Sequence, residues 1–258
     1  MPDTSKPLIV FITGAGSGLG RALAHHYGQQ GAKLGLLGRR SEPLQELAFL
    51  YKAQVYLADV RDAAAVESAA HDFLGKVGTP DIAIGSAGIS VGTLTQERGD
   101  LRVFQAVMDV NVMGLVHTFH PFIHAMSERG SGVLCGISSV AGIRGLAGGG
   151  AYSASKAAAR VYLESLRLEL RSKGISVVTV APGYIDTPMT RVNPYAMPFR
   201  MSAESAARKV ARAIKLCRRY SVIPWQMRVA ASILKHMPGP IYDRLFEKAK
   251  RKPRELPI

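Results

Sequence analysis

The sequence contains little cysteine and no long apolar run. Its two cysteines, Cys135 and Cys217, are too few for a disulfide framework and lack metal-ligand spacing, so we interpret both as reduced thiols in the core of a cytoplasmic protein. The first apolar run, Leu8–Thr13, is too short for the apolar region of a signal peptide. No run approaches the length of a transmembrane helix. We therefore expect a protein that neither spans a membrane nor holds a metal ion.

Acidic residues are also scarce, and the imbalance is concentrated at one end. The 258 residues include 33 Lys and Arg but only 19 Asp and Glu, which gives a net charge of +14. From Arg200 onward there are 15 basic and 4 acidic side chains, whereas the rest of the chain is nearly neutral. Such a basic segment suggests an anionic surface as partner. We do not expect nucleic acid, because no helix-turn-helix or RNA-binding motif is present and aromatic side chains are sparse there.

Short β-rich segments alternate with longer helical ones. The first of them, Leu8–Thr13, is apolar without polar alternation, as in a strand buried on both faces. Repetition of this order predicts one α/β domain with a Rossmann-type, doubly wound parallel sheet of about seven strands and helices on both faces. We assign residues 1–224 to this domain. The expected strands are Leu8–Thr13, Lys33–Gly38, Gln54–Val60, Asp81–Gly88, Gly132–Ser139, Ile175–Pro182 and Tyr220–Pro224.

Residues 225–258 form a basic, amphipathic extension of the same domain. Apolar side chains recur at helix-like intervals over residues 225–246, and Pro238 with Gly239 should divide them into two short helices. A basic amphipathic helix can lie in the interface of an anionic membrane. Alternatively, its apolar face covers a substrate cleft or contacts a second subunit. The sequence leaves these readings open and permits a peripheral membrane location.

A glycine-rich turn follows the first strand and opens the first helix. Its sequence, TGAGSGLG, has the spacing T-G-x-x-x-G-x-G with Gly14, Gly18 and Gly20, rather than a strict G-x-G-x-x-G. Glycines at these places allow a tight turn and let backbone N–H groups approach a pyrophosphate at a helix N-terminus. The turn therefore predicts a dinucleotide site.

The end of the second strand indicates which dinucleotide is bound. An acidic residue there would bind the ribose 2′-hydroxyl of NAD(H), but this chain has Arg39 and Arg40. Arginine matches a 2′-phosphate in charge and geometry. We therefore predict NADP(H) as the cofactor, and NAD(H) as the less favoured alternative.

Tyr152 and Lys156 are four residues apart in an alanine-rich segment, so they share one face of a predicted helix. Alone, such a pair is most often a solvated surface pair. Here Ser139 ends the fifth strand, at the edge where ligands bind in such sheets, and Asn111 lies in a long predicted helix, residues 100–126. With the glycine turn and the segment PGYIDT, these residues resemble the short-chain dehydrogenase/reductase family over about residues 8–201.

The resemblance implies a role for each of these residues. Tyr152 would be the general acid or base, and Ser139 would hydrogen-bond the reacting oxygen, with Ser138 as its fallback. Lys156 would lower the pKa of the tyrosine and bind the nicotinamide ribose, and Asn111 would hold a water that links Lys156 to solvent. The implied cofactor-binding residues are Gly14, Ser17, Gly18, Leu19, Gly20, Arg39, Arg40, Asp59, Val60, Ala87, Gly88, Tyr152, Lys156, Pro182, Gly183, Ile185 and Thr187.

One position departs from the family pattern. Two asparagines usually precede the Ala-Gly pair after the fourth strand, but here Gly85 and Ser86 do. The difference puts some hydrogen bonds that brace the sheet in doubt.

The predicted substrate loops offer apolar side chains, which suggest a lipophilic carbonyl or alcohol such as a 3-oxo lipid or sterol-like ketone. The tail weakly resembles that of ketosphinganine-type reductases. The alternative is that these apolar residues pack the loops against the core and do not contact a substrate. We expect a homodimer or homotetramer, and a redox sensor or scaffold that binds NADP without turnover is the alternative to an enzyme. The loop residues are Ile143, Leu146, Met189, Met197 and Phe199.

Overall fold

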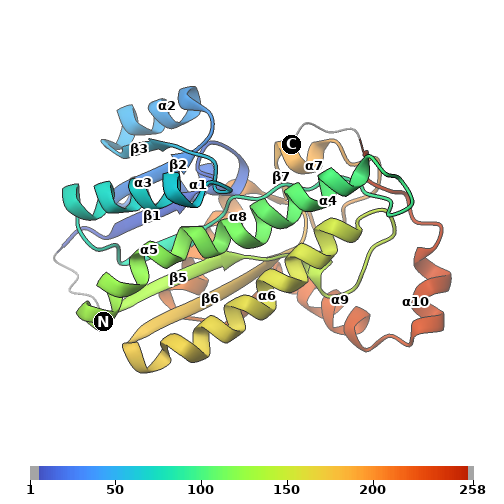
Figure 1. Ribbon diagram of the computed structural model, residues 1–258. Helices are drawn as coiled ribbons and strands as arrows, with labels where there is room; N and C mark the ends of the chain where they lie inside the picture. Colours follow the sequence, from blue (N-terminus) through green and yellow to red (C-terminus); the bar gives the residue numbers. More distant parts are fainter. Residues whose placement is uncertain (1–5, 255–258) are drawn as a thin grey trace.

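A single parallel sheet forms the centre of the computed structural model, which describes residues 6–254 (Figure 1). Within that range the seven strands have the order β3-β2-β1-β4-β5-β6-β9. The order reverses between β1 and β4, which creates the switch point where doubly wound sheets bind ligands. The predicted fold class is confirmed. The strands are β1 Ile9–Thr13, β2 Lys33–Gly38, β3 Gln54–Leu57, β4 Ile82–Gly85, β5 Gly132–Ile137, β6 Ile175–Pro182 and β9 Tyr220–Ile223.

Helices cover both faces of the sheet, and β1 shows why its sequence is apolar throughout. Val10 and Ile12 pack into the cluster formed with α1, α2 and α8, whereas Phe11 between them packs into the cluster formed with α3, α5 and α6. Because successive side chains point to opposite faces, a strand covered on both sides needs apolar residues at every position. These helices are α1 Gly18–Gly28, α2 Ser41–Tyr51, α3 Ala63–Lys76, α5 Gly114–Arg129, α6 Gly150–Leu170 and α8 Ala203–Lys215.

The long helix expected over residues 100–126 is not continuous. It consists of α4 (Asp100–Met108), a π-helical turn (Asp109–Met113) and α5, which continues to Arg129. Single π turns inside α-helices are frequent at functional sites. This one contains Asn111, which is fully buried.

The segment between β6 and α8 contains three short elements that the sequence pattern did not indicate. They are β7 (Ile185–Asp186), α7 (Pro188–Arg191) and β8 (Met201–Ser202), and β7 pairs with β8. Cys135 is buried as expected, but Cys217 follows α8 and is exposed, so the expectation that both thiols are buried is wrong for Cys217.

The C-terminal extension divides into two helices, as Pro238 and Gly239 predicted: α9 (Trp225–His236) and α10 (Gly239–Phe246). Both lie at the end of the molecule to which β5 and β6 point (Figure 1). Met227 and Ala231 on the inner side of α9 are buried against side chains of the sheet domain. Among residues 6–254, no helix has the length and apolar character needed to cross a membrane.

Candidate active site

A pocket of about 180 Å³ lies at the carboxyl ends of β1, β4, β5 and β6. A larger open groove of about 1170 Å³ runs along β9, α8 and α9, but none of the predicted catalytic or cofactor-binding residues line it, and of the predicted substrate residues only Ile143 does. We therefore place the candidate site in the smaller pocket. The predicted residues that line it are Gly14, Ser17, Gly18, Leu19, Gly20, Ala87, Gly88, Ser139, Tyr152, Lys156, Pro182, Gly183, Ile185 and Thr187.

The glycine turn forms one wall of the pocket. Gly14 and Gly18 have φ values of +70° and +51°, a region that side chains rarely adopt, and a Cβ at Gly14 would lie 2.7 Å from the backbone of Ala87. Ser17 is at the N-cap of α1 without a side-chain cap, and the first turn has no acidic residue. The helix therefore presents its positive N-terminal end to the pocket, an arrangement that fits a phosphate group.

The arginines after β2 lie outside this pocket. Arg40 donates a hydrogen bond to the Gly16 carbonyl at 3.2 Å. Arg39 approaches the Asp59 carboxylate at 3.7 Å, and Arg61 donates to both oxygens of that carboxylate at 3.1 and 2.8 Å. The hydrogen bond from Arg61 is the main cause that lowers the pKa of Asp59. We did not identify Arg61 from the sequence, although its place two residues after Asp59 was a signal for it.

Val60 is a packing residue in this structure. A Cβ at Gly114 would lie 2.8 Å from a methyl group of Val60, so only glycine fits above it. The Val60 carbonyl lies 2.8 Å from Nδ1 of His117. Helix α3 is capped by Asp62, whose carboxylate accepts from the Ala65 N–H at 3.0 Å.

Ser139, Tyr152 and Lys156 meet at the opposite wall. Ser139 lies two residues after the end of β5, and the other two are one turn apart on α6. Burial raises the pKa of Tyr152, and a hydrogen bond with the Ser139 hydroxyl opposes that rise. The Lys156 ammonium lies 5.8 Å from the centre of the Tyr152 ring and donates to the Ile137 carbonyl at 2.9 Å. Burial lowers the pKa of Lys156 to about 8.

The hydroxyl of Ser138 is already engaged. It donates to the Lys156 carbonyl at 2.7 Å and so ties β5 to α6. The Ser139 hydroxyl accepts from the Ala141 N–H at 3.1 Å and makes a long contact of 3.4 Å to the Pro182 carbonyl. Of the two serines, it is the one that acts on the pKa of Tyr152.

Asn111 lies behind the pocket. It exchanges two hydrogen bonds with the backbone of Ile89, at 2.8 and 2.9 Å, and donates to the Ser155 hydroxyl at 2.9 Å. A Cβ at Gly88 would lie 3.2 Å from the Asn111 amide oxygen and 3.5 Å from the Lys156 ammonium. Asn111 thus joins the π turn, the loop after β4 and α6 close to Lys156. We did not identify Ser155 from the sequence.

The place of the missing asparagines is filled with apolar side chains. A Cβ at Gly85 would collide with Leu115 and come within 3.3 Å of Phe119, both from α5. The hydroxyls of Thr13 and Thr118 lie 3.3 Å apart beside this contact. The packing of α5 on a glycine replaces part of the bracing that side-chain amides would give.

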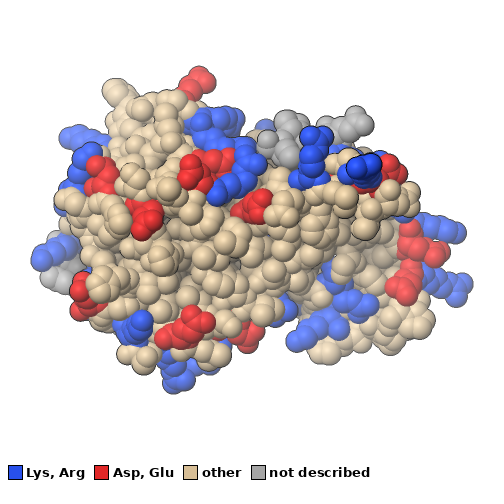
Figure 2. All heavy atoms as spheres, in the orientation of Figure 1, with Lys and Arg blue, Asp and Glu red and all other residues tan. Residues whose placement is uncertain are grey.

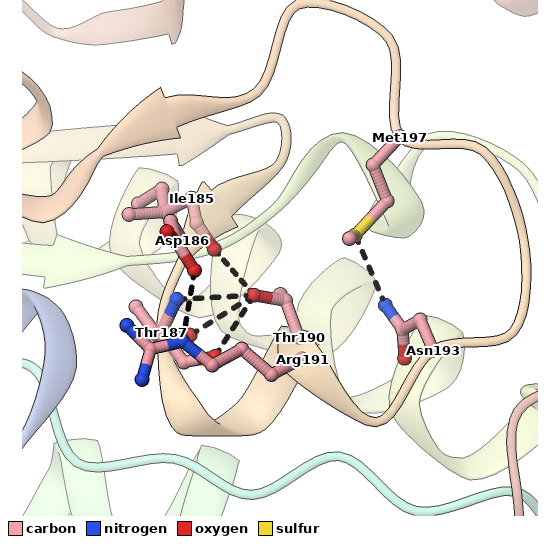
Figure 3. A network of polar contacts seen from close by, with 7 residues as sticks. All are labelled: Ile185, Asp186, Thr187, Thr190, Arg191, Asn193 and Met197. Atoms are coloured by element: carbon pink, nitrogen blue, oxygen red, sulfur yellow. Dashed lines mark hydrogen bonds and ion pairs between the residues drawn. The ribbon is translucent and has the colours of Figure 1, made fainter.

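Thr187 faces the glycine turn at the mouth of the pocket. A Cβ at Gly18 would lie 3.1 Å from the Thr187 methyl group. The Thr190 hydroxyl accepts from the Thr187 N–H at 3.1 Å and donates to the Ile185 carbonyl at 2.5 Å, as Figure 3 shows. Thr190 therefore fixes the loop that carries Thr187, and the sequence analysis did not single it out.

Comparison with known proteins decides the family. The chain matches the short chain dehydrogenase family over residues 8–196. It belongs to that family. An uncharacterized oxidoreductase of Myxococcus xanthus is 35% identical over 237 residues, which cover 90% of this chain and 93% of the relative. An NADP-dependent 3-hydroxy acid dehydrogenase of Escherichia coli O6:H1 is 33% identical over 69% of this chain and 73% of its own length.

Solved structures agree with this assignment. A short chain dehydrogenase from Burkholderia cenocepacia J2315, determined in complex with NADP, superimposes with a TM-score of 0.82 at 25% sequence identity. The match covers 93% of this chain and 98% of that one. The chain therefore has the fold of a short-chain dehydrogenase along nearly its whole length.

In this short-chain dehydrogenase, only one of the apolar residues predicted to contact substrate lines the pocket. Of the predicted apolar residues, Met189 lines the pocket, Phe199 is 52% exposed, and Ile143 packs with the inner side of α9. Two phenols lie in the same segment, because the rings of Tyr184 and Tyr195 are 6.4 Å apart.

Tyr195 is also close to the catalytic candidates. Burial, with smaller contributions from Tyr184 and Tyr152, raises its pKa to about 12. Two residues before Tyr195, the Asn193 side chain contacts the sulfur of Met197, and its buried amide oxygen has no hydrogen-bond partner in the described part of the chain (Figure 3).

Proposed function

We propose that this protein is an NADP(H)-dependent oxidoreductase that interconverts a carbonyl and a secondary alcohol, with Tyr152 as general acid and base. The observation that carries the proposal is the meeting of the Ser139 hydroxyl, the Tyr152 phenol and the Lys156 ammonium beside the glycine turn. A sensor or scaffold would need the dinucleotide site but not this cluster of polar groups.

The pocket residues suit a nicotinamide dinucleotide. A bound nicotinamide would supply or accept the hydride. Gly14, Gly18 and Gly20 would hold the pyrophosphate with the N-terminus of α1, and Thr187 would hydrogen-bond the carboxamide. The rest of the dinucleotide would contact the other predicted residues of the pocket, which are Ser17, Leu19, Ala87, Gly88, Pro182, Gly183 and Ile185.

Proton transfer depends on the surroundings of Tyr152. A free tyrosine has a pKa near 10, and burial raises it here, so the phenolate needs stabilisation. The nearby ammonium of Lys156 and the hydrogen bond with Ser139 both favour the phenolate. In the reductive direction, Tyr152 donates its proton to the carbonyl oxygen while Ser139 holds that oxygen in place.

Preference for NADP(H) follows from the end of β2. Arg39 and Arg40 stand where an acidic residue would bind a 2′-hydroxyl, and Arg61 adds a third guanidinium next to Asp59. These groups favour a 2′-phosphate. The names of the Escherichia coli relative and the Burkholderia structure, both of which include NADP, point the same way.

Two surfaces support the expected partners. Over α5 and α6 the middle of the face in Figure 2 consists mostly of uncharged side chains. Val161 and Leu168 of α6 are exposed, which suits a homo-oligomer. On α9, Trp225, Val229 and Ile233 form an exposed apolar stripe at intervals of four residues. Lys and Arg surround this end of the molecule, so we assign the stripe to an anionic membrane surface (Figure 2).

The central test is Tyr152→Phe, which keeps the ring and removes the transferable proton. General acid–base catalysis contributes typically about 10²–10⁴-fold, so we expect NADPH-dependent ketone reduction to fall by at least that order, with NADPH affinity and melting temperature retained. Tyr162→Phe, a change to a half-buried tyrosine ten residues further along α6, is the control. Turnover by Tyr152→Phe at the parent rate would contradict the mechanism.

A further inference from the structure

The last described residues return to the substrate side of the molecule. We call residues 247–254 the C-terminal strap. The Gly92 N–H, in the loop after β4, donates to the Pro253 carbonyl at 2.9 Å. In the loop after β5, a Cβ at Gly148 would lie 2.8 Å from the Arg251 side chain. The strap therefore lies directly on the loops that follow β4 and β5. These loops are at the carboxyl ends of the strands, where substrates bind in this fold.

An ion pair between a partly exposed arginine and a buried aspartate fixes the end of the strap. Arg254 donates to both oxygens of Asp100 at 2.8 and 3.2 Å, and it lies 3.4 Å from Glu97. Asp100, at the start of α4, is only 7% exposed and also accepts from the Leu94 N–H at 2.7 Å. Because two-point pairs of this kind constrain geometry, the strap is held in one position.

Lys252 contacts the loop after β6, next to the pocket. Its ammonium donates to the Met189 carbonyl at 2.9 Å, and Met189 lines the candidate active site. Within residues 6–254, no carboxylate lies within 4 Å of this ammonium. Burial lowers the pKa of Lys252 to about 8.

An ammonium in this position suits an anionic ligand. Removing a charge from water is unfavourable unless an opposite charge or sufficient hydrogen bonds compensate. The neighbouring acidic groups, Asp100 and Glu97, are engaged by Arg254. Among residues 6–254 Lys252 has no carboxylate partner, and a negative group that enters the pocket would supply one.

We propose that Lys252 binds an anionic group of the substrate, a carboxylate or a similar oxyanion, at the strap side of the pocket. The inference rests on the proposed function, because it takes the reacting carbonyl to be at Tyr152. It narrows the substrate class to oxo acids and hydroxy acids, whose apolar part contacts Met189. The strap would then be the element that selects them.

The test separates binding from turnover. Calorimetry on protein saturated with NADPH measures the binding of 3-hydroxyoctanoate and of its methyl ester. No reaction can occur, because each ligand is already an alcohol and the cofactor is also in its reduced form. We expect wild type to prefer the acid, and Lys252→Met to lower the ratio of acid to ester affinity roughly ten- to hundredfold, the size of a hydrogen bond between charged groups. Lys250→Met, a change to an exposed neighbour, should leave the ratio unchanged.

A second variant tests whether the strap only shapes the pocket. Arg254→Ala releases the end of the strap but keeps the ammonium, so it should weaken the acid and the ester together. Equal losses for both ligands in Lys252→Met would overturn the proposal, as would the absence of any preference for the acid in wild type. A loss of NADPH affinity in Lys252→Met without a change in the ratio would assign the ammonium to the cofactor and also overturn it.

The outcomes distinguish this inference from the proposed function. Steady-state reduction of 3-oxooctanoate and its methyl ester with NADPH is measured on the same proteins. Selective binding of the acid without any reduction would contradict the oxidoreductase proposal and leave the anion site standing. Reduction of 3-oxooctanoate and its methyl ester with equal efficiency would contradict the anion site and leave the oxidoreductase proposal standing.

Discussion

The buried ammonium of Lys156 should make the free protein less stable than it could be. Lys156 is only 5% exposed, and burial lowers its pKa from 10.5 to about 8. Each pK unit corresponds to about 1.4 kcal/mol, so at pH 7 the folded protein holds this charge at a cost of about 3 kcal/mol relative to the unfolded chain. The proposed role of Lys156 beside Tyr152 is the reason we give for keeping a lysine at this cost.

Lys156→Met removes the charge and keeps a similar volume. It also leaves the Ile137 carbonyl without its donor, which costs about 1–3 kcal/mol. We therefore expect the free energy of unfolding at pH 7 to stay the same or to rise by up to about 2 kcal/mol, a gain of a few degrees in melting temperature. Activity should fall by about 10²-fold or more, because the phenolate loses its cation.

The pH dependence gives the sharper measurement. Between pH 8 and 10.5 the unfolded state of wild type binds one more proton than the folded state, so its stability rises with pH. Denaturant unfolding at pH 8 and pH 9.5, without cofactor, should show wild type gaining about 2 kcal/mol relative to Lys156→Met. Lys235→Met, at an exposed lysine of α9, is the control and should behave as wild type. Identical pH dependence in wild type and Lys156→Met would refute the reasoning.

Three further predictions test the surroundings of the site. Arg39→Ala should weaken NADPH binding roughly ten- to hundredfold and leave NADH nearly unchanged; equal losses for both cofactors in calorimetry would remove Arg39 from the 2′-phosphate site. Leu168→Glu should lower the mass measured by light scattering to that of a smaller assembly, whereas an unchanged mass would exclude the α6 face from the subunit contact. Changing Trp225, Val229 and Ile233 together to Ser should abolish co-sedimentation with anionic vesicles at low salt and leave the fold intact; pelleting that persists, or that is equal on neutral vesicles, would rule out the stripe as a membrane contact.

The sheet could be predicted because each of its strands carries a local signal. Parallel strands covered on both faces need apolar residues throughout, and the run around Phe11 shows that need directly in the sequence. Tyr152 and Lys156 were also predictable as a pair, because four residues along a helix return to the same face. Each of these signals is contained in a short stretch of the sequence.

The features that the sequence did not reveal depend on contacts between distant residues. The π turn around Asn111 is stabilised by hydrogen bonds to Ile89 and Ser155, which are 22 and 44 residues away. The pair between Arg254 and Asp100 joins residues 154 positions apart. No local pattern distinguishes an arginine that will reach such a partner from one that stays in solvent.

The tail shows how this limit affects a functional conclusion. From the sequence, eight basic residues of the tail were candidates for attraction to an anionic membrane, at about 1 kcal/mol for each residue near the surface, and five or six of them would suffice for reversible binding. The structure withdraws two of them, because Arg254 is paired with Asp100 and Lys252 is directed at the Met189 carbonyl. Under the proposed membrane contact, counting these two residues would overstate the electrostatic contribution by about 2 kcal/mol. On the proposals for Lys252 and for the stripe of α9, a truncation of the tail would change activity and membrane binding together. Only single substitutions on each side can separate the two effects.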